Sequence, residues 1–156
     1  MRPRSPGRDT SSRILIMTPD REYASRFLAE SRHFERHVEV SACISVAATM
    51  MLSSQYSPDI ILLDVCYGEV LLQQVVREIR HELPGTIQLM LCEQETDTAR
   101  NIARTIKANG WVNKDIDHCR EIFNLLCSVA LTHRETGMRH RMKWSSTQME
   151  MQFLFS

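Results

Sequence analysis

Asp64 is the residue whose position most directly suggests chemistry. It follows the apolar run IILL (60–63) and precedes Val65, so a strand with a buried character leads directly into a carboxylate. An unpaired carboxylate inside an apolar core is costly. We therefore expect Asp64 at the point where this strand leaves the core, as part of a site.

The histidines and cysteines show no comparable pattern. The six histidines lack metal-ligand spacing with acids or cysteines, and only His33 and His37, at i and i+4, can share a helical face. The five cysteines are odd in number and form no CxxC pair, which favours reduced thiols in a cytoplasmic protein. No glycine-rich phosphate loop or nucleophile elbow occurs.

The elements that must position Asp64 alternate between strand and helix along the chain. Short β-rich runs predict five strands, at 13–17, 37–41, 60–65, 86–91 and 110–114. Helical periodicity predicts a helix after each of them, at 21–32, 43–55, 69–83, 96–109 and 115–131, the last with Asp115 or Asp117 near its N-cap. Five βα units predict an α/β fold with a doubly wound, five-stranded parallel sheet. Asp64 then lies at the carboxyl edge of the sheet, where ligands bind.

Residues 13–131 resemble the receiver domain of bacterial two-component response regulators, whose fold is a flavodoxin-like (βα)5 sheet. PDIILLD matches the segment that ends in the phospho-accepting aspartate, here Asp64, and GWVNKD matches the segment that contains the phosphate-contacting lysine, here Lys114. Cys92 stands where the family has a serine or threonine, and Trp111 stands where it has an aromatic switch residue.

The resemblance implies transfer of a phosphoryl group to the Asp64 carboxylate with the help of a divalent cation. The family usually carries two adjacent acids after the first strand, whereas this chain has Thr18 and Pro19 there and Asp20 one position later. Mg²⁺ favours several oxygen ligands, so Asp20 and Asp64 predict at most a weak metal site and no firm cofactor.

Each of these residues also has a structural interpretation. Asp64 and Lys114 can form a buried ion pair, and Asp20 can be the N-cap of the first helix. Cys92 can be a small packing residue as well as a reactive thiol, and Trp111 can be a core residue as well as a switch.

The two ends of the chain are expected to lie outside the receiver-like segment. The formal charge is zero, but residues 1–12 and 132–156 are basic and the middle is acidic. We expect 1–12 to be a disordered leader. In the tail, LTHRE (131–135) resembles the start of a LuxR-type helix-turn-helix domain, so 132–156 is a linker or a truncated start of such a domain; MEMQFLF (149–155) can equally be a β segment.

These features together predict an atypical receiver domain that acts in signal transduction and transcription regulation, and not an enzyme. It is expected to work in the cytoplasm through protein contacts, as a homodimer through the fourth and fifth or the first and fifth helices, or with a partner regulator or histidine kinase. DNA is expected to be bound only through a C-terminal domain that is absent or incomplete here. No apolar run is long enough to cross a bilayer. The alternatives are a stand-alone adaptor that binds a partner protein without DNA, and a conventional phospho-accepting receiver that holds Mg²⁺ with Asp20 and Asp64.

Overall fold

The computed structural model describes residues 12–33, 38–94, 96–115, 119–136, 140–144 and 151–155. In the first part of the chain they form β1 (Ser12–Met17), α1 (Arg21–Ser31), β2 (Val38–Cys43), α2 (Val46–Tyr56), β3 (Ile60–Asp64), a 3-10 turn η1 (Val65–Tyr67) and α3 (Glu69–Glu82). The second part forms β4 (Ile87–Cys92), α4 (Asp97–Ile106), β5 (Gly110–Asn113), α5 (Cys119–Thr136), β6 (His140–Trp144) and β7 (Met151–Phe155).

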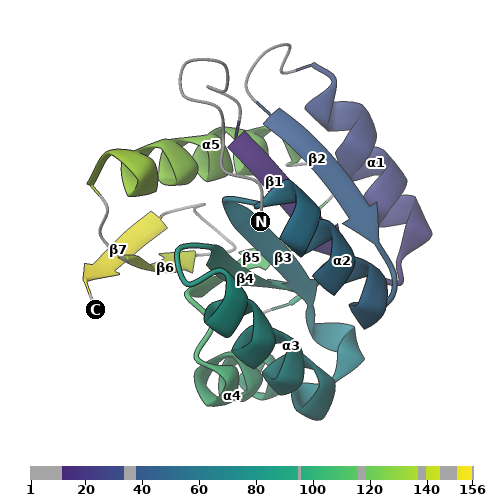
Figure 1. The fold of residues 1–156 in the computed structure, drawn as a ribbon, viewed down its shortest axis with the longest axis vertical. Coiled ribbons are helices and arrows are strands. Elements are labelled where there is room, and N and C mark those ends of the chain that lie inside the picture. Colours follow the sequence, from purple (N-terminus) through teal and green to yellow (C-terminus); the bar gives the residue numbers. More distant parts are fainter. Residues whose placement is uncertain are drawn as a thin grey trace.

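Strands β1 to β5 form one sheet in the order β2-β1-β3-β4-β5, and every neighbouring pair is parallel (Figure 1). This confirms the predicted α/β class and the doubly wound, five-stranded sheet. The strand order reverses direction between β1 and β3, which makes their carboxyl ends the topological switch point where ligands bind in such sheets.

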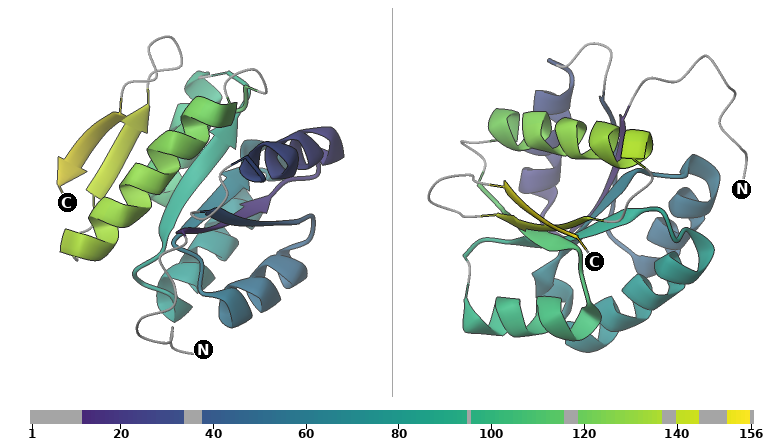
Figure 2. Two further views of the ribbon diagram at one scale, coloured as in Figure 1. Left: turned by 90° about the horizontal axis from the view of Figure 1, so that it is seen from above. Right: turned by 90° about the vertical axis from the view of Figure 1, so that its left-hand side faces the viewer.

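Helices cover both faces of this sheet, as Figure 2 shows from two directions. Helices α1 and α5 lie on one face, and α2, α3 and α4 lie on the other. Successive residues of a strand point to opposite faces, so Ile14 and Ile16 belong to the α1 and α5 side while Leu15 and Met17 belong to the other. The central strands β3 and β4 are buried at every residue, which explains their unbroken apolar runs.

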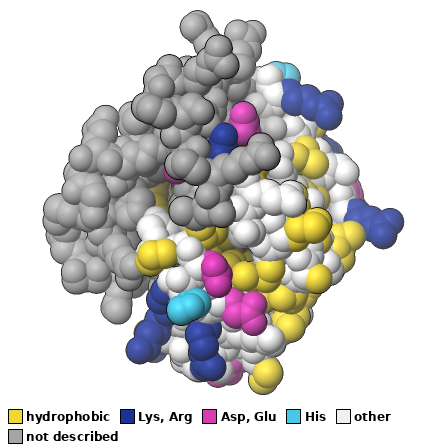
Figure 3. Space-filling view, viewed as in Figure 1, with side chains coloured by type: hydrophobic (Ala, Val, Ile, Leu, Met, Phe, Trp, Pro, Cys, Tyr) yellow, Lys and Arg dark blue, Asp and Glu magenta, His cyan; other side chains and the backbone are white. Residues whose placement is uncertain are grey.

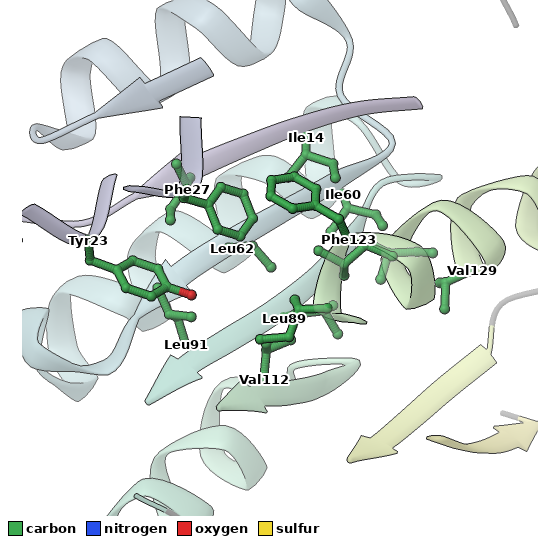
Figure 4. Close-up of a cluster of buried hydrophobic side chains, with 14 residues drawn as sticks. Ile14, Tyr23, Phe27, Ile60, Leu62, Leu89, Leu91, Val112, Phe123 and Val129 are labelled. Atoms are coloured by element: carbon green, nitrogen blue, oxygen red, sulfur yellow. The ribbon is translucent and has the colours of Figure 1, made fainter. Parts of the chain in front are cut away.

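Aromatic packing joins α1 to α5 over the sheet (Figure 4). The ring centroids of Phe27 and Phe123 lie 4.2 Å apart, and both side chains are fully buried. Tyr23 extends the same cluster, with its ring centroid 5.9 Å from that of Phe27. Aromatic contacts of this kind add about 0.5–1.5 kcal/mol to the burial of apolar area, so they fix the two helices against each other.

Several predicted boundaries were wrong. Cys43, expected at the start of the second helix, is the last residue of β2. It pairs with Met17 in the parallel register of β1 and β2. Helix α4 ends at Ile106 because Lys107 takes the left-handed conformation (φ 58°), while the Asn109 side chain caps the backbone of β4. Helix α5 begins at Cys119, so Asp115 is too far upstream to be its N-cap.

The structure describes parts of the C-terminal segment. Residues 132–136 extend α5 beyond the expected end at Leu131. Strands β6 and β7 then pair in antiparallel fashion as a separate two-stranded sheet, which confirms the β interpretation of residues 151–155. Residues 1–11 of the expected leader (1–12), His37 and Asp117 lie outside the described residues, whereas Ser12 is the first residue of β1. Among the described helices, none has both the length and the apolar character of a membrane-spanning segment.

Candidate functional site

The site begins where β3 ends. Asp64 is the last residue of β3 and is only 2 % exposed. Its Oδ1 accepts a hydrogen bond of 3.0 Å from the backbone N–H of Cys66, which turns the chain into η1. An aspartate side chain that accepts a hydrogen bond from the backbone N–H two residues further along the chain commonly starts a turn. The carboxylate is thus held at the strand end, as the sequence predicts.

Thr18 directly follows β1 and lies next to Asp64 at the ends of the strands. The parallel register of β1 and β3 pairs Met17 with Leu63, so the next residues, Thr18 and Asp64, lie side by side. The Thr18 hydroxyl donates a 2.6 Å hydrogen bond to Asp64 Oδ2, and both residues are buried. The same hydroxyl oxygen accepts a 3.1 Å bond from the backbone N–H of Asp20. Thr18 therefore orders both the acid and the start of α1.

Lys114 reaches the site from the end of β5. Its backbone N–H donates a 2.7 Å hydrogen bond to the carbonyl of Cys92, which extends the pairing of β4 and β5 by one residue. Its Nζ lies 3.1 Å from Asp64 Oδ2 and 2.9 Å from Asp20 Oδ2. The ammonium also lies 5.4 Å from the centre of the Tyr23 ring, within the range of a cation–π contact. Lys114 thus bridges the two carboxylates at the switch point.

Asp20 has a structural role in addition to this ion pair. It is the N-cap of α1, and its Oδ1 accepts a 3.0 Å hydrogen bond from the backbone N–H of Tyr23. Its Oδ2 faces the Lys114 ammonium. The N-cap interpretation of Asp20 is therefore confirmed.

The charges of this cluster are set by their neighbours. Burial works to raise the pKa of Asp64, but hydrogen bonds from Thr18, Cys66 and Lys114 outweigh it and hold the pKa below its ordinary value. The Tyr23 backbone bond and the Lys114 ammonium lower the pKa of Asp20. Burial alone would lower the pKa of Lys114, yet the two carboxylates raise it. All three groups are ionised at neutral pH, and together they carry one negative charge.

A cleft of about 590 Å³ opens beside the ion pair. Asp64, Cys66 and Lys114 contribute to its wall from β3, η1 and the end of β5, and the rest comes mainly from the β4–α4 connection and α4. Cys92, at the end of β4, lines the same cleft but is only 4 % exposed, and its sulfur lies 3.8 Å from the carbonyl of Val112. Its position fits a packing role better than a reactive thiol.

A divalent cation does not fit this arrangement of donors. Asp64 Oδ2 already accepts from Thr18 and Lys114, and Asp64 Oδ1 accepts from the Cys66 amide. Both oxygens of Asp20 are also engaged. Mg²⁺ demands near-octahedral oxygen ligands and gives up water reluctantly. An internal ammonium takes the place between the two carboxylates, and among the described residues no cluster of three metal-ligating acids, histidines or cysteines occurs.

Trp111 is placed away from this cluster. It lies in β5, is partly exposed, and packs against the apolar cluster under α3 and α4. Sequence reasoning missed the hydrogen bond of Thr18 and the ring contact of Tyr23. The predicted parallel sheet contained a signal for Thr18, because a residue that follows the first strand must lie beside the end of the third. Tyr23 gave no such signal, since nothing in the helical pattern of residues 21–32 points to a contact with a lysine.

No protein-family model matches the sequence, and no curated protein matches it either. Solved structures do match. The isolated REC domain of RcsB from Salmonella enterica serovar Typhimurium aligns with a TM-score of 0.63 over 78 % of this chain and 90 % of that one, at 10 % identity. The chain has the receiver fold.

Two further structures support this receiver fold. A response regulator from Thermotoga maritima aligns with a TM-score of 0.59 at 18 % identity, over 76 % of this chain and 98 % of that chain. The chemotaxis response regulator CheY4 of Vibrio cholerae aligns with a TM-score of 0.59 at 16 % identity, over 75 % and 99 %. At such identities the likeness concerns the fold alone. The roles of Asp64 and Lys114 must be argued from their geometry.

Proposed function

We propose that this chain is an atypical receiver domain that transmits signals through protein contacts, with Mg²⁺-dependent phosphorylation of Asp64 weak or absent. The observation that carries the proposal is the position of Lys114 Nζ, 3.1 Å from Asp64 Oδ2 and 2.9 Å from Asp20 Oδ2. The resemblance to receivers supports Asp64 as the phospho-acceptor candidate and Lys114 as the phosphate-contacting lysine. The Lys114 ammonium, however, already lies between the two acids that a metal ion would bridge.

The chemistry explains why the acceptor should be a poor one. Attack by Asp64 on a phosphoryl donor needs a free carboxylate oxygen and cations that neutralise the developing charge. Oδ2 is shared by a hydroxyl and an ammonium, and Oδ1 is bonded to the Cys66 amide. Lys114 is the single cation in direct contact with Asp64 among the described residues. Attack would require breaking at least one of these bonds without compensation from a metal ion.

Action through protein contacts and in transcription regulation is proposed from the receiver fold and from the C-terminal segment 132–156. A regulator that has lost efficient phosphorylation can still act by binding a second protein, such as another regulator or a kinase, or by forming dimers. Transcription regulation, suggested by the LTHRE segment, would need a DNA-reading helix in a further domain. The stand-alone adaptor remains the second candidate because β6 and β7 pair as strands. In this reading the chain turns over no substrate.

The test is incubation of the full chain with acetyl phosphate and Mg²⁺, followed by intact-mass analysis. We expect no phosphorylated species, for either the wild type or Asp64→Asn. A mass increase of one phosphoryl group that appears in the wild type and is lost in Asp64→Asn would support the conventional phospho-accepting receiver instead. A gel-shift assay with the same full chain separates the other two candidates, since specific DNA binding would exclude the adaptor.

A further inference from the structure

Helix α2 differs from the other α-helices of the described chain because it has no charged residue. Its sequence, VAATMMLSSQY, contains neither acids nor bases, whereas α1, α3, α4 and α5 each carry both. A helix on the surface of a globular domain normally shows charged side chains to the solvent. The exposed side of α2 is therefore unusual for a face that stays in water.

The pattern of burial on α2 is inverted. The two fully buried positions, Thr49 and Ser53, are small and polar, and Thr49 bonds inward to Cys43 Sγ and to the carbonyl of Ser45. The larger apolar residues lie outward or at the flanks. Met51 is 57 % exposed, and Ile44, just before the helix, is 46 % exposed. Ile44, Ala47 and Met51 follow the i, i+3, i+7 spacing of one helical face, here called the α2 stripe, which ends at the uncharged Gln55.

A groove lies beside the α2 stripe. It has a volume of about 340 Å³ and runs between α2 and the end of α3, lined by Met50, Ser53, Ser54, Ile79, Glu82 and Leu83. Figure 3 shows hydrophobic side chains gathered over the part of the surface where Figure 1 draws α2. Methionine is long and flexible, so Met50 and Met51 can adapt their shape to an apposed surface and fill such a groove. The α2 stripe carries no charge, and Glu82 is the one charged residue among those that line the groove.

We propose that the α2 stripe and this groove are a self-association surface, which docks a second copy of the same chain. The charge pattern favours this occupant. In a two-fold symmetric contact every residue near the axis faces its own copy, so a charged residue there meets a like charge. Like charges placed together at an interface cost several kcal/mol. The α2 stripe has no charge to repel itself, whereas the exposed faces of the other α-helices would place like charges near such an axis.

This surface is also tied to the site around Asp64. The turn that Asp64 starts leads into η1, where the Tyr67 hydroxyl donates a hydrogen bond to the carbonyl of Ile44. Ile44 is the first residue of the α2 stripe. A change in the Asp64 turn can therefore move the start of the stripe. The surface differs from the α4, α5 and α1 faces expected from the sequence, and the inference does not depend on whether Asp64 is phosphorylated.

The test is sedimentation velocity of the full chain over a wide concentration range. We expect a monomer–dimer equilibrium, and we expect Met51→Glu to raise the dimer dissociation constant at least about tenfold. Ala29→Glu is the control because Ala29 is also an exposed apolar residue, but it lies on α1, on the face of the sheet opposite to α2. The control should dimerise like the wild type. Thermal unfolding followed by circular dichroism verifies that both variants are folded.

A charge-swap experiment makes the symmetry testable. Met51→Lys alone should also weaken dimerisation, since it places two cations together. An equimolar mixture of Met51→Glu and Met51→Lys should recover dimers, because opposite charges then face each other. A wild type that stays monomeric at every concentration overturns the proposal. So does a folded Met51→Glu that dimerises like the wild type, or an Ala29→Glu that dissociates as readily as Met51→Glu.

Discussion

The hydroxyl of Thr18 lies 2.6 Å from Asp64 Oδ2 and donates a hydrogen bond to it across the ends of β1 and β3. A neutral donor thus stands beside the acid at a position where the receiver family usually carries carboxylates. The hydroxyl supplies a hydrogen bond to the Asp64 carboxylate without adding negative charge. The cation that contacts Asp64 in the described part of the chain is the ammonium of Lys114.

This relationship predicts that Thr18→Asp will make stability depend on Mg²⁺. Two adjacent carboxylates repel each other, so the variant should unfold more easily than the wild type in EDTA, by about 1–3 kcal/mol. Mg²⁺ then has two acids to bridge, and binding to the native state raises stability. The measurement is the melting temperature with EDTA and with millimolar Mg²⁺. The melting temperature of the wild type should not respond to the metal.

Thr18→Val is the control for the Thr18→Asp experiment. Valine has nearly the shape of threonine but offers no donor to Asp64 and no acceptor to the Asp20 amide, so the loss of these two bonds should cost about 1–3 kcal/mol. It should create no response to Mg²⁺. If Thr18→Val and Thr18→Asp respond equally to the metal, the second carboxylate is not the cause.

The ion pair predicts a large cost for removal of the Lys114 ammonium. Lys114→Met keeps most of the side-chain volume but leaves the buried Asp64 carboxylate without its cation. Breaking a buried pair in this way typically costs about 3–5 kcal/mol, and the partial exposure of Asp20 places the expectation near the lower end. Urea unfolding at neutral pH measures the loss.

Lys107→Met is the matched substitution for Lys114→Met. Lys107 is exposed and forms the left-handed C-cap of α4 through its backbone, so its side chain should contribute less than about 1 kcal/mol. Equal losses for the two variants would show that the bridge from Lys114 to the two acids contributes nothing specific.

Much of the fold could be predicted because its signals are local. The apolar runs of β3 and β4 and the alternation of strand and helix required no knowledge of distant contacts. The boundaries that failed depend on such contacts or on unusual backbone geometry. The local sequence around Cys43 predicts a helix, but its pairing with Met17 places it in β2. Nothing in the sequence near Lys107 announces a left-handed residue, since glycine or asparagine usually supplies that conformation.

The site was predictable to a similar extent. Asp64 and Lys114 come together because parallel strands end at the same edge of a sheet, which the strand pattern already implies. The second bond of Lys114, to Asp20, did not follow from the pattern. It depends on the N-cap bond to Tyr23, which orients the Asp20 side chain, and on the direction in which the lysine side chain leaves β5. Such side-chain choices are decided by packing.

The pKa of Asp64 predicts how stability changes in acid. Its folded pKa lies below the ordinary value of 3.8, so the unfolded chain binds the proton more tightly. The stabilisation is therefore complete above that ordinary value and is lost as the pH falls through the folded pKa. We expect the difference in unfolding free energy between the wild type and Asp64→Asn to be constant from pH 7 to about pH 5 and to shrink below about pH 4.

Urea unfolding across this pH range tests the acid prediction, since urea carries no charge and leaves the ion pair unscreened. Glu30→Gln serves as the control because Glu30 is a partly exposed acid of α1 outside the cluster of Lys114, Asp20 and Asp64. Its difference from the wild type should stay nearly flat over the same range. A difference for Asp64→Asn that grows as the pH falls has the wrong sign and contradicts the assignment.

The thiol of Cys66 provides a chemical probe of the Asp64 charge. Cys66 is exposed, yet partial shielding of its sulfur, with the hydrogen bond and negative charge of Asp64, raises its pKa from 9.0 to about 12. Only the thiolate reacts with iodoacetamide. At pH 8.5 we expect Cys66 in the native protein to be alkylated about two orders of magnitude more slowly than in the urea-unfolded chain. Asp64→Asn should speed the reaction because it removes the nearby charge.

Peptide mapping by mass spectrometry locates the label and separates Cys66 from the other thiols. Cys43 and Cys92 are buried and serve as internal references, since their protection reports global folding rather than the charge of Asp64. If Cys66 reacts at the same rate in the wild type and in Asp64→Asn while these two stay protected, Asp64 does not control the thiol. A faster reaction confined to Cys66 would locate a negative charge at the end of β3 in the folded protein in solution.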